Sequence, residues 1–144
     1  MDYRADYYMA DATLDWQTFS LNGNYEVLGS DAGVFAFQTP LATLHKFQGW
    51  ADLFLTTPSA GVRDLNFTLT KKFPAIPVLP ALSATIAYHK FDSDIGDLDY
   101  GQEWDAQVGF KLLETAVLLK YADFDSSGFG ADTRKFWVQL GWIY

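Results

Sequence analysis

The sequence contains no cysteine and only two histidines, His45 and His89. Without cysteine the chain has no disulfide, no thiolate metal site and no cysteine nucleophile. Two histidines are too few for a zinc centre built mainly from histidine, and they give no Ser-His-Asp order that can be argued. The glycines around Phe129 precede no helix and do not form a phosphate-binding loop. We therefore expect no enzymatic activity, no cofactor and no metal.

Basic residues and long apolar runs are also scarce. Lys and Arg total 10 against 18 Asp and Glu, which gives a net charge of −8. This balance argues against a protein that neutralises nucleic-acid phosphates. No window approaches the roughly 18 consecutive apolar residues of a transmembrane helix. Residues 1–6 lack the basic start and apolar stretch of a signal peptide, and 144 residues favour a single domain.

Alternation of apolar and polar residues dominates the chain and predicts an all-β fold. The expected strands are 3–10, 19–27, 65–72, 82–89, 103–112, 117–122 and 135–144. Short links alternate with long ones, the longest being 28–64, in which a short helix within 40–55 is an alternative. Tight turns at one end and long loops at the other are typical of an antiparallel up-and-down β-barrel. We expect residues 1–144 to be one barrel segment of about seven strands.

Such a sheet can bury its apolar face in a protein core or expose it to lipid, and the two arrangements differ in which face contacts water. The central positions of the apolar face carry no charge from the second expected strand onward, whereas the opposite face is charged. A water-filled lumen accommodates such charges, which favours a transmembrane β-barrel. The predicted pore-lining residues are Arg4, Asp6, Glu26, Lys72, His89, Glu103, Asp105, Lys111, Lys120 and Lys135. Their mixed sign leaves the choice between anions and cations open.

Aromatic residues of the apolar face gather toward the two strand ends. Membrane–water interfaces favour such rings at two levels, and a soluble barrel has no reason to segregate them. The predicted belts are Tyr25, Tyr88, Trp104, Tyr121 and Phe136 at the long-loop end, and Phe19, Phe73, Phe110, Trp142 and Tyr144 at the other. Two alternatives remain: a small soluble β-barrel that binds an apolar ligand in its interior, and a purely structural barrel segment without a pore.

The longest link and the last strand resemble a known family. Residues 25–31 and 37–52, with the closing strand 136–144, resemble the C-terminal part of a Gram-negative outer-membrane porin of the alginate export family. The resemblance implies a bacterial outer-membrane channel for passive diffusion of small polar or anionic, sugar-like solutes. It also implies outer-membrane lipid and the barrel assembly machinery as partners, the latter through the closing strand.

The number of strands departs from this pattern. Bacterial single-chain barrels have even strand counts, and seven is odd. We expect the chain to be a fragment whose upstream strands belong to the same barrel.

Three groups of residues suggest a pore constriction, a calcium site or a pair of catalytic carboxylates. The long link could fold into the lumen and narrow it, with His45, Lys46, Trp50 and Asp52 as the predicted constriction. The loop 92–99 holds four aspartates that could bind Ca²⁺, but it lacks the glycine and terminal glutamate of an EF-hand, so a solvated loop is the preferred interpretation. Glu103 and Asp105 share a face, as paired glycosidase carboxylates do, but no partner for such chemistry is recognisable.

Overall fold

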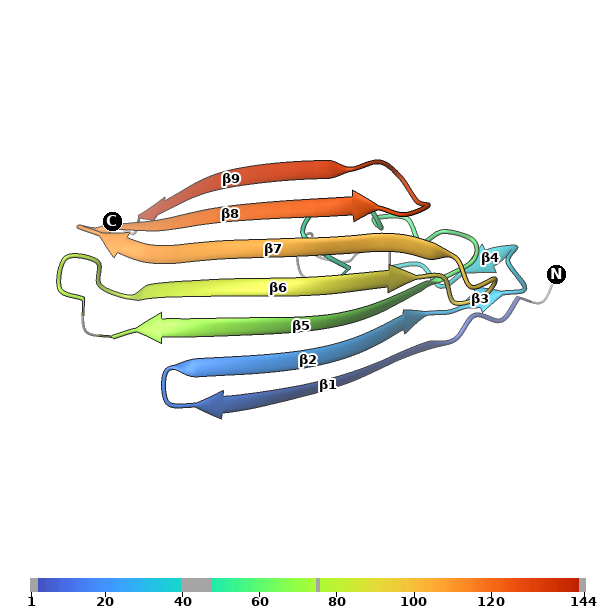
Figure 1. Cartoon of the computed structure of the whole chain (residues 1–144), viewed down its shortest axis with the longest axis horizontal. Helices are drawn as coiled ribbons and strands as arrows, with labels where there is room; N and C mark the ends of the chain where they lie inside the picture. Colours follow the sequence, from blue (N-terminus) through green and yellow to red (C-terminus); the bar gives the residue numbers. More distant parts are fainter. Residues whose placement is uncertain (1–2, 40–47, 75, 143–144) are drawn as a thin grey trace.

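The computed structural model describes residues 3–39, 48–74 and 76–142. In these ranges the protein is all-β, and seven strands form one antiparallel sheet in the order β1-β2-β5-β6-β7-β8-β9 (Figure 1). The strands of the sheet are β1 Tyr7–Trp16, β2 Phe19–Leu28, β5 Val62–Phe73, β6 Leu82–Asp92, β7 Asp99–Leu112, β8 Thr115–Ser126 and β9 Thr133–Trp142. A small hairpin of β3 (Ser30–Asp31) and β4 (Phe35–Ala36) lies in the longest link. None of the described residues belongs to a helix long and apolar enough to cross a membrane.

Six of the seven expected strands are confirmed, and each of β5 to β8 is longer than predicted. The predicted alternation of faces also holds from β2 to β9, because residues paired directly across two strands point to the same face. Tyr88 is paired with Trp104, and His89 with Glu103. The local period of two therefore determined both the strands and their faces.

The first strand was predicted in the wrong place. The sequence suggested 3–10 with Trp16 in a turn, whereas β1 runs to Trp16 and a two-residue turn begins at Gln17, whose φ is 52°. The resulting register pairs Met9 with Glu26 and Trp16 with Phe19. Met9 therefore lies on the charged face, the reverse of the expectation for this strand, and Trp16 lies on the apolar face.

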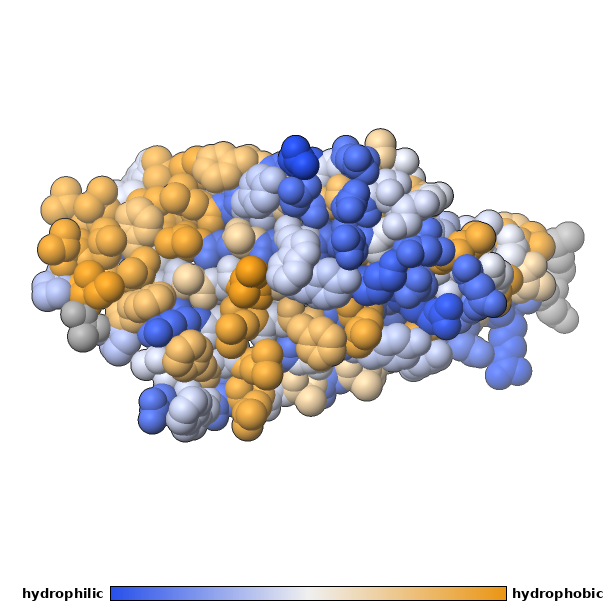
Figure 2. Space-filling model, viewed as in Figure 1, coloured by the Kyte–Doolittle hydropathy of each residue, from blue (hydrophilic) through white to orange (hydrophobic). Residues whose placement is uncertain are grey.

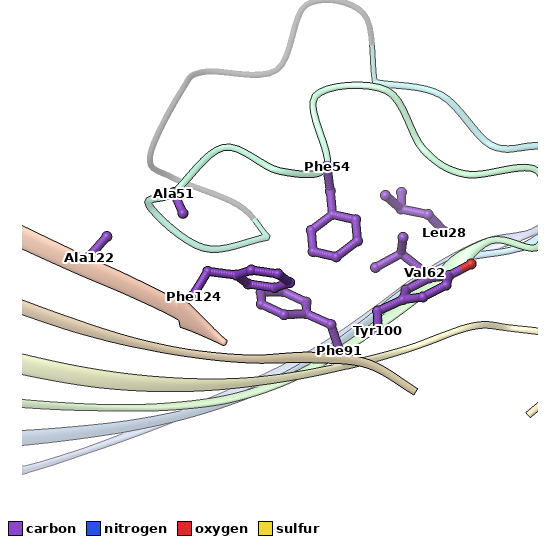
Figure 3. Packing of buried hydrophobic residues seen from close by; sticks show 8 residues of the cluster. All are labelled: Leu28, Ala51, Phe54, Val62, Phe91, Tyr100, Ala122 and Phe124. Carbon is purple, nitrogen blue, oxygen red and sulfur yellow. The ribbon is translucent and has the colours of Figure 1, made fainter. Parts of the chain in front are cut away.

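The suggested helix within 40–55 is not found in its described part, because residues 48–55 form turns and bends, and residues 40–47 lie outside the described ranges. Instead, residues 50–54 cross over the charged face of the sheet at the end where the long links lie. Phe54 points at the sheet and packs against Phe91 and Phe124, with ring centroids 4.7 and 6.2 Å away (Figure 3). The buried cluster consists of Leu28, Ala51, Phe54, Val62, Phe91, Tyr100, Ala122 and Phe124. The main apolar core thus fixes the loop to the sheet.

The sheet is open, and its two edges run in the same direction. β1 and β9 both run from the end with the long links to the end with the short turns. They do so because an odd number of strands, each antiparallel to the next, lies between them in the sheet. Joining β1 directly to β9 would pair them in parallel. Closure with antiparallel pairs alone requires an odd number of additional strands.

Candidate functional site

The apolar face of the sheet is exposed, and aromatic residues mark both of its limits. β2, β7 and β9 each carry two aromatic residues that are six positions apart on this face, a separation of about 20 Å at 3.3 Å per residue. The pairs are Phe19 with Tyr25, Trp104 with Phe110, and Phe136 with Trp142. Trp104, Phe136 and Trp142 are 50%, 65% and 61% exposed. Exposed apolar patches of this kind mark sites of interaction with proteins or membranes.

The band between the aromatic residues crosses the hydrogen-bonded rows of the sheet obliquely. Tyr25 lies one same-face row nearer the long-link end than the Tyr88–Trp104 pair, and the Tyr121–Phe136 pair lies one such row nearer the short-turn end than the Tyr88–Trp104 pair. Figure 2 shows apolar side chains gathered toward the short-turn end and polar ones toward the end with β3 and β4. Strands that tilt relative to an apolar layer produce such a stagger, and barrel strands tilt by roughly 35–45°.

Beyond this band the same face becomes charged. Arg134 Nε donates to Asp123 Oδ1 at 3.0 Å, and Lys90 Nζ donates to Asp99 at 2.5 Å. The bond from Lys90 holds the pKa of the Asp99 carboxyl below its ordinary value. Charged pairs at this end, against apolar side chains in the band, separate the face into a polar zone and an apolar zone.

The opposite face carries the predicted charged residues, and part of the longest link covers it. Glu103 is fully buried and accepts the backbone N–H groups of Trp50 at 2.5 Å and Ala51 at 2.7 Å. Gln48 Nε2 donates to Glu26 Oε2 at 2.5 Å, and the Tyr7 hydroxyl donates to Glu26 Oε1 at 3.0 Å. Charged acceptors form short, strong bonds of this kind. The loop is therefore held on the charged face by side chains of the strands.

Two lysines hold the loop from the neighbouring strands. Lys135 on β9 donates to the carbonyl of Ala51 and lies 3.4 Å from an Asp52 oxygen. Lys120 on β8 places its Nζ 4.1 Å from the centroid of the Trp50 ring, a cation–π contact. The predicted constriction residues Trp50 and Asp52 thus lie against the charged face, in contact with β8 and β9.

A buried cluster of ionisable side chains from β5, β6 and β7 lies beneath this loop. His89 Nδ1 on β6 lies 3.0 Å from both Asp64 oxygens on β5, and its Nε2 lies 3.6 Å from Asp105 on β7. Asp64 and Asp105 are each 1% exposed. Burying unpaired charges is costly. The His89 ring between Asp64 and Asp105, and the hydrogen bonds from the loop to Glu103, therefore stabilise these buried carboxyl groups.

The structure brings together only some of the predicted pore-lining residues. Glu26, His89, Glu103, Asp105, Lys120 and Lys135 surround the loop, whereas Lys72 and Lys111 are exposed at the short-turn end of the same face. Arg4 and Asp6 were expected on the first strand, but both precede β1. They are exposed, and the carbonyl of Asp6 accepts the N–H of Gly29 instead.

Three of the predicted site residues fall outside the described ranges: His45, Lys46 and Tyr144. The other predicted belt residues, Phe19, Tyr25, Phe73, Tyr88, Trp104, Phe110, Tyr121, Phe136 and Trp142, all lie on the apolar face. At the short-turn level Lys71 joins them, with its Nζ 4.6 Å from the Phe19 ring and 5.0 Å from the Phe73 ring. A lysine that lies over aromatic rings at the edge of an apolar zone keeps its ammonium group toward water.

Sequence reasoning missed Asp64 and Gly49. Asp64 was assigned to the longest link, although it continues the polar alternation of Asn66 and Thr68 and could have been found by that signal. Gly49 has φ of 79°, and a Cβ there would lie 2.6 Å from a Glu103 oxygen. No local pattern in the sequence predicts the close contact of Gly49 with Glu103, because the two residues are far apart in the chain.

Hydrogen-bonding and charged side chains make up this arrangement. Among residues 3–39, 48–74 and 76–142, no group of three or more His, Asp or Glu side chains is placed to hold a metal ion. Asp94 and Asp99, from the loop considered for Ca²⁺, already bond the Ser30 N–H and Lys90. Comparison of the chain with protein-family models, curated proteins and solved structures finds no match.

Proposed function

We propose that the chain forms part of the wall of a bacterial outer-membrane β-barrel whose charged face lines a passage for small polar solutes. One observation carries this proposal: the exposed face of the sheet is apolar between two levels of aromatic residues, whereas the opposite face is charged. Strands of 10–14 residues in the sheet are long enough to cross a bilayer, since a tilted strand needs roughly 9–11 residues. The resemblance to alginate export porins supports the same interpretation.

The covered charged face favours a narrowed passage. Residues 48–54 are fixed to that face by Glu103, Lys120 and Lys135. A loop held inside a barrel reduces the width of its lumen and places charges of both signs beside the solute. In this proposal the free edges of β1 and β9 pair with further strands of the same barrel, outer-membrane lipid surrounds the apolar face, and the assembly machinery recognises the closing strand.

The soluble alternative requires the opposite curvature, with the apolar face inside and an apolar ligand bound there. The placement of the loop counts against it, because Phe54 and its neighbours already cover the charged face and leave the apolar face uncovered.

The test uses tryptophans on the two faces of the full chain. Trp16, Trp104 and Trp142 lie on the apolar face, whereas Trp50 and Trp137 lie on the charged side. We expect variants that each retain one tryptophan to be quenched by brominated lipid only when that residue is on the apolar face. Equal quenching of Trp50 and Trp104, or a chain that stays monomeric and strand-rich without detergent or lipid, would contradict the proposal.

A further inference from the structure

A cavity of about 370 Å³ lies beside the covering loop on the charged side of the sheet. It spans β1, β2, β5 and β6, and residues 48–50 of the loop form one of its walls. Ligand pockets occupy roughly 300–1,000 Å³, so this one suits a small solute. It adjoins the anchored part of the loop, where the proposed passage would be narrow.

Amide and hydroxyl groups are frequent in its wall: Asn22, Asn24, Asn66, Thr68 and Gln48. An amide side chain both donates and accepts hydrogen bonds, as a sugar hydroxyl does. Asn66 Nδ2 lies 3.4 Å from Asn24 Oδ1 and 3.2 Å from Asp64, so neighbouring strands hold it in place. Trp50 also lines the cavity and has its ring fixed by Lys120. Oriented polar groups beside an aromatic ring are the usual make-up of a site for a polar organic ligand.

The charge of the wall disfavours anions. Asp11, Glu26 and Asp64 line the cavity, whereas His89 is the single basic side chain among the lining residues that the structure describes, and it is bonded to Asp64. A wall with an excess of carboxylates repels a carboxylate solute at close range.

The carboxylates are not arranged as ligands for a metal cation either. Glu26 accepts bonds from Tyr7 and Gln48, and Asp11 accepts one from Asn22 at 2.7 Å. No group of acidic and histidine side chains in the described ranges is placed to hold a metal ion. The groups that the wall offers a solute are therefore mainly hydrogen-bonding ones.

From this wall we infer a binding subsite for an uncharged saccharide and discrimination against sugar acids. The inference rests on the proposed function, since it names the solute class of the same passage. It differs from the resemblance, which implies anionic as well as polar solutes.

The test is an NMR titration of the ¹⁵N-labelled full chain in detergent micelles with maltose and, separately, with digalacturonate. We expect maltose to shift the Asn66 side-chain amide and the Trp50 indole signals in a saturable manner, and digalacturonate to bind at least roughly tenfold more weakly. Asn66→Leu is expected to weaken maltose binding by a similar factor. Its matched control is Gln107→Leu, because Gln107 is equally half-buried on the same face but does not line the cavity.

A charge variant separates recognition from repulsion. Asp11→Asn removes one exposed carboxylate from the wall and should strengthen digalacturonate binding more than maltose binding, so the preference for maltose becomes smaller. Binding of digalacturonate as tight as that of maltose, saccharide shifts that are absent, or shifts that Asn66→Leu leaves unchanged would overturn the inference. Lipid quenching of the tryptophans is independent of saccharide binding, so failure of this inference is distinguishable from failure of the proposed function.

Discussion

At Gly49 the covering loop lies directly against Glu103 of the sheet. Its φ of 79° is left-handed, and an added Cβ would lie 2.6–2.8 Å from the carboxylate of Glu103. Gly49→Ala should destabilise the docked loop by about 1–3 kcal/mol for the backbone alone, with displacement of the carboxylate added to this cost. Limited proteolysis within residues 48–57 should become faster. Gly141→Ala is the control, because no atom lies within 4 Å of a Cβ at that position, and equal cleavage of both variants would contradict the assignment.

Glu103 supplies the acceptor for two adjacent backbone N–H groups, those of Trp50 and Ala51. Glu103→Ala would remove this shared acceptor, and a buried N–H left without one costs about 1–3 kcal/mol. We expect hydrogen exchange of both amides to become at least roughly tenfold faster, since 1.4 kcal/mol is a factor of ten. Glu114→Ala should change neither amide, because Glu114 lies in an exposed turn and contacts Lys111. Unchanged exchange in the Glu103 variant would show that other contacts hold the loop.

At the scale of one element, β9 presents adjacent residues to two different surroundings. Val138 lies on the apolar face between Phe136 and Trp142, and Gln139 lies on the charged face. Val138→Lys should lower the free energy of unfolding in lipid vesicles by about 2–4 kcal/mol, the cost of a lysine on the lipid face near the bilayer midplane. Gln139→Lys on the same edge strand should change it by less than about 1 kcal/mol. Urea titrations measure both, and equal losses would mean that the two faces share one surrounding.

At the scale of the whole molecule, the open sheet should be least stable at its edges. β1 and β9 each have one neighbouring strand, whereas β6 and β7 lie between two. Amide hydrogen exchange of the monomeric chain in detergent should therefore be slowest in β6 and β7 and fastest in β1 and β9. Edge strands as slow as the centre, with light scattering showing several copies per particle, would instead show that unpaired edges join between chains.

The sequence by itself determined six strands and the faces of the residues that were predicted to belong to them. Alternation of polarity is a local property, so Phe136 and Val138 were placed on one face and Lys135 on the other without knowledge of any partner. The aromatic levels followed from the same local pattern.

Only the tertiary structure decided how these parts meet. The register of β1 depends on the turn at Gln17 and on pairing with β2, and it moved Met9 to the charged face. The contacts of Glu103 with Trp50 and of Lys135 with Ala51 join residues 53 and 84 positions apart. Periodicity of polarity cannot predict such contacts. They depend on which side chains of a distant strand the loop meets when it closes, and not on the residues next to it in the chain.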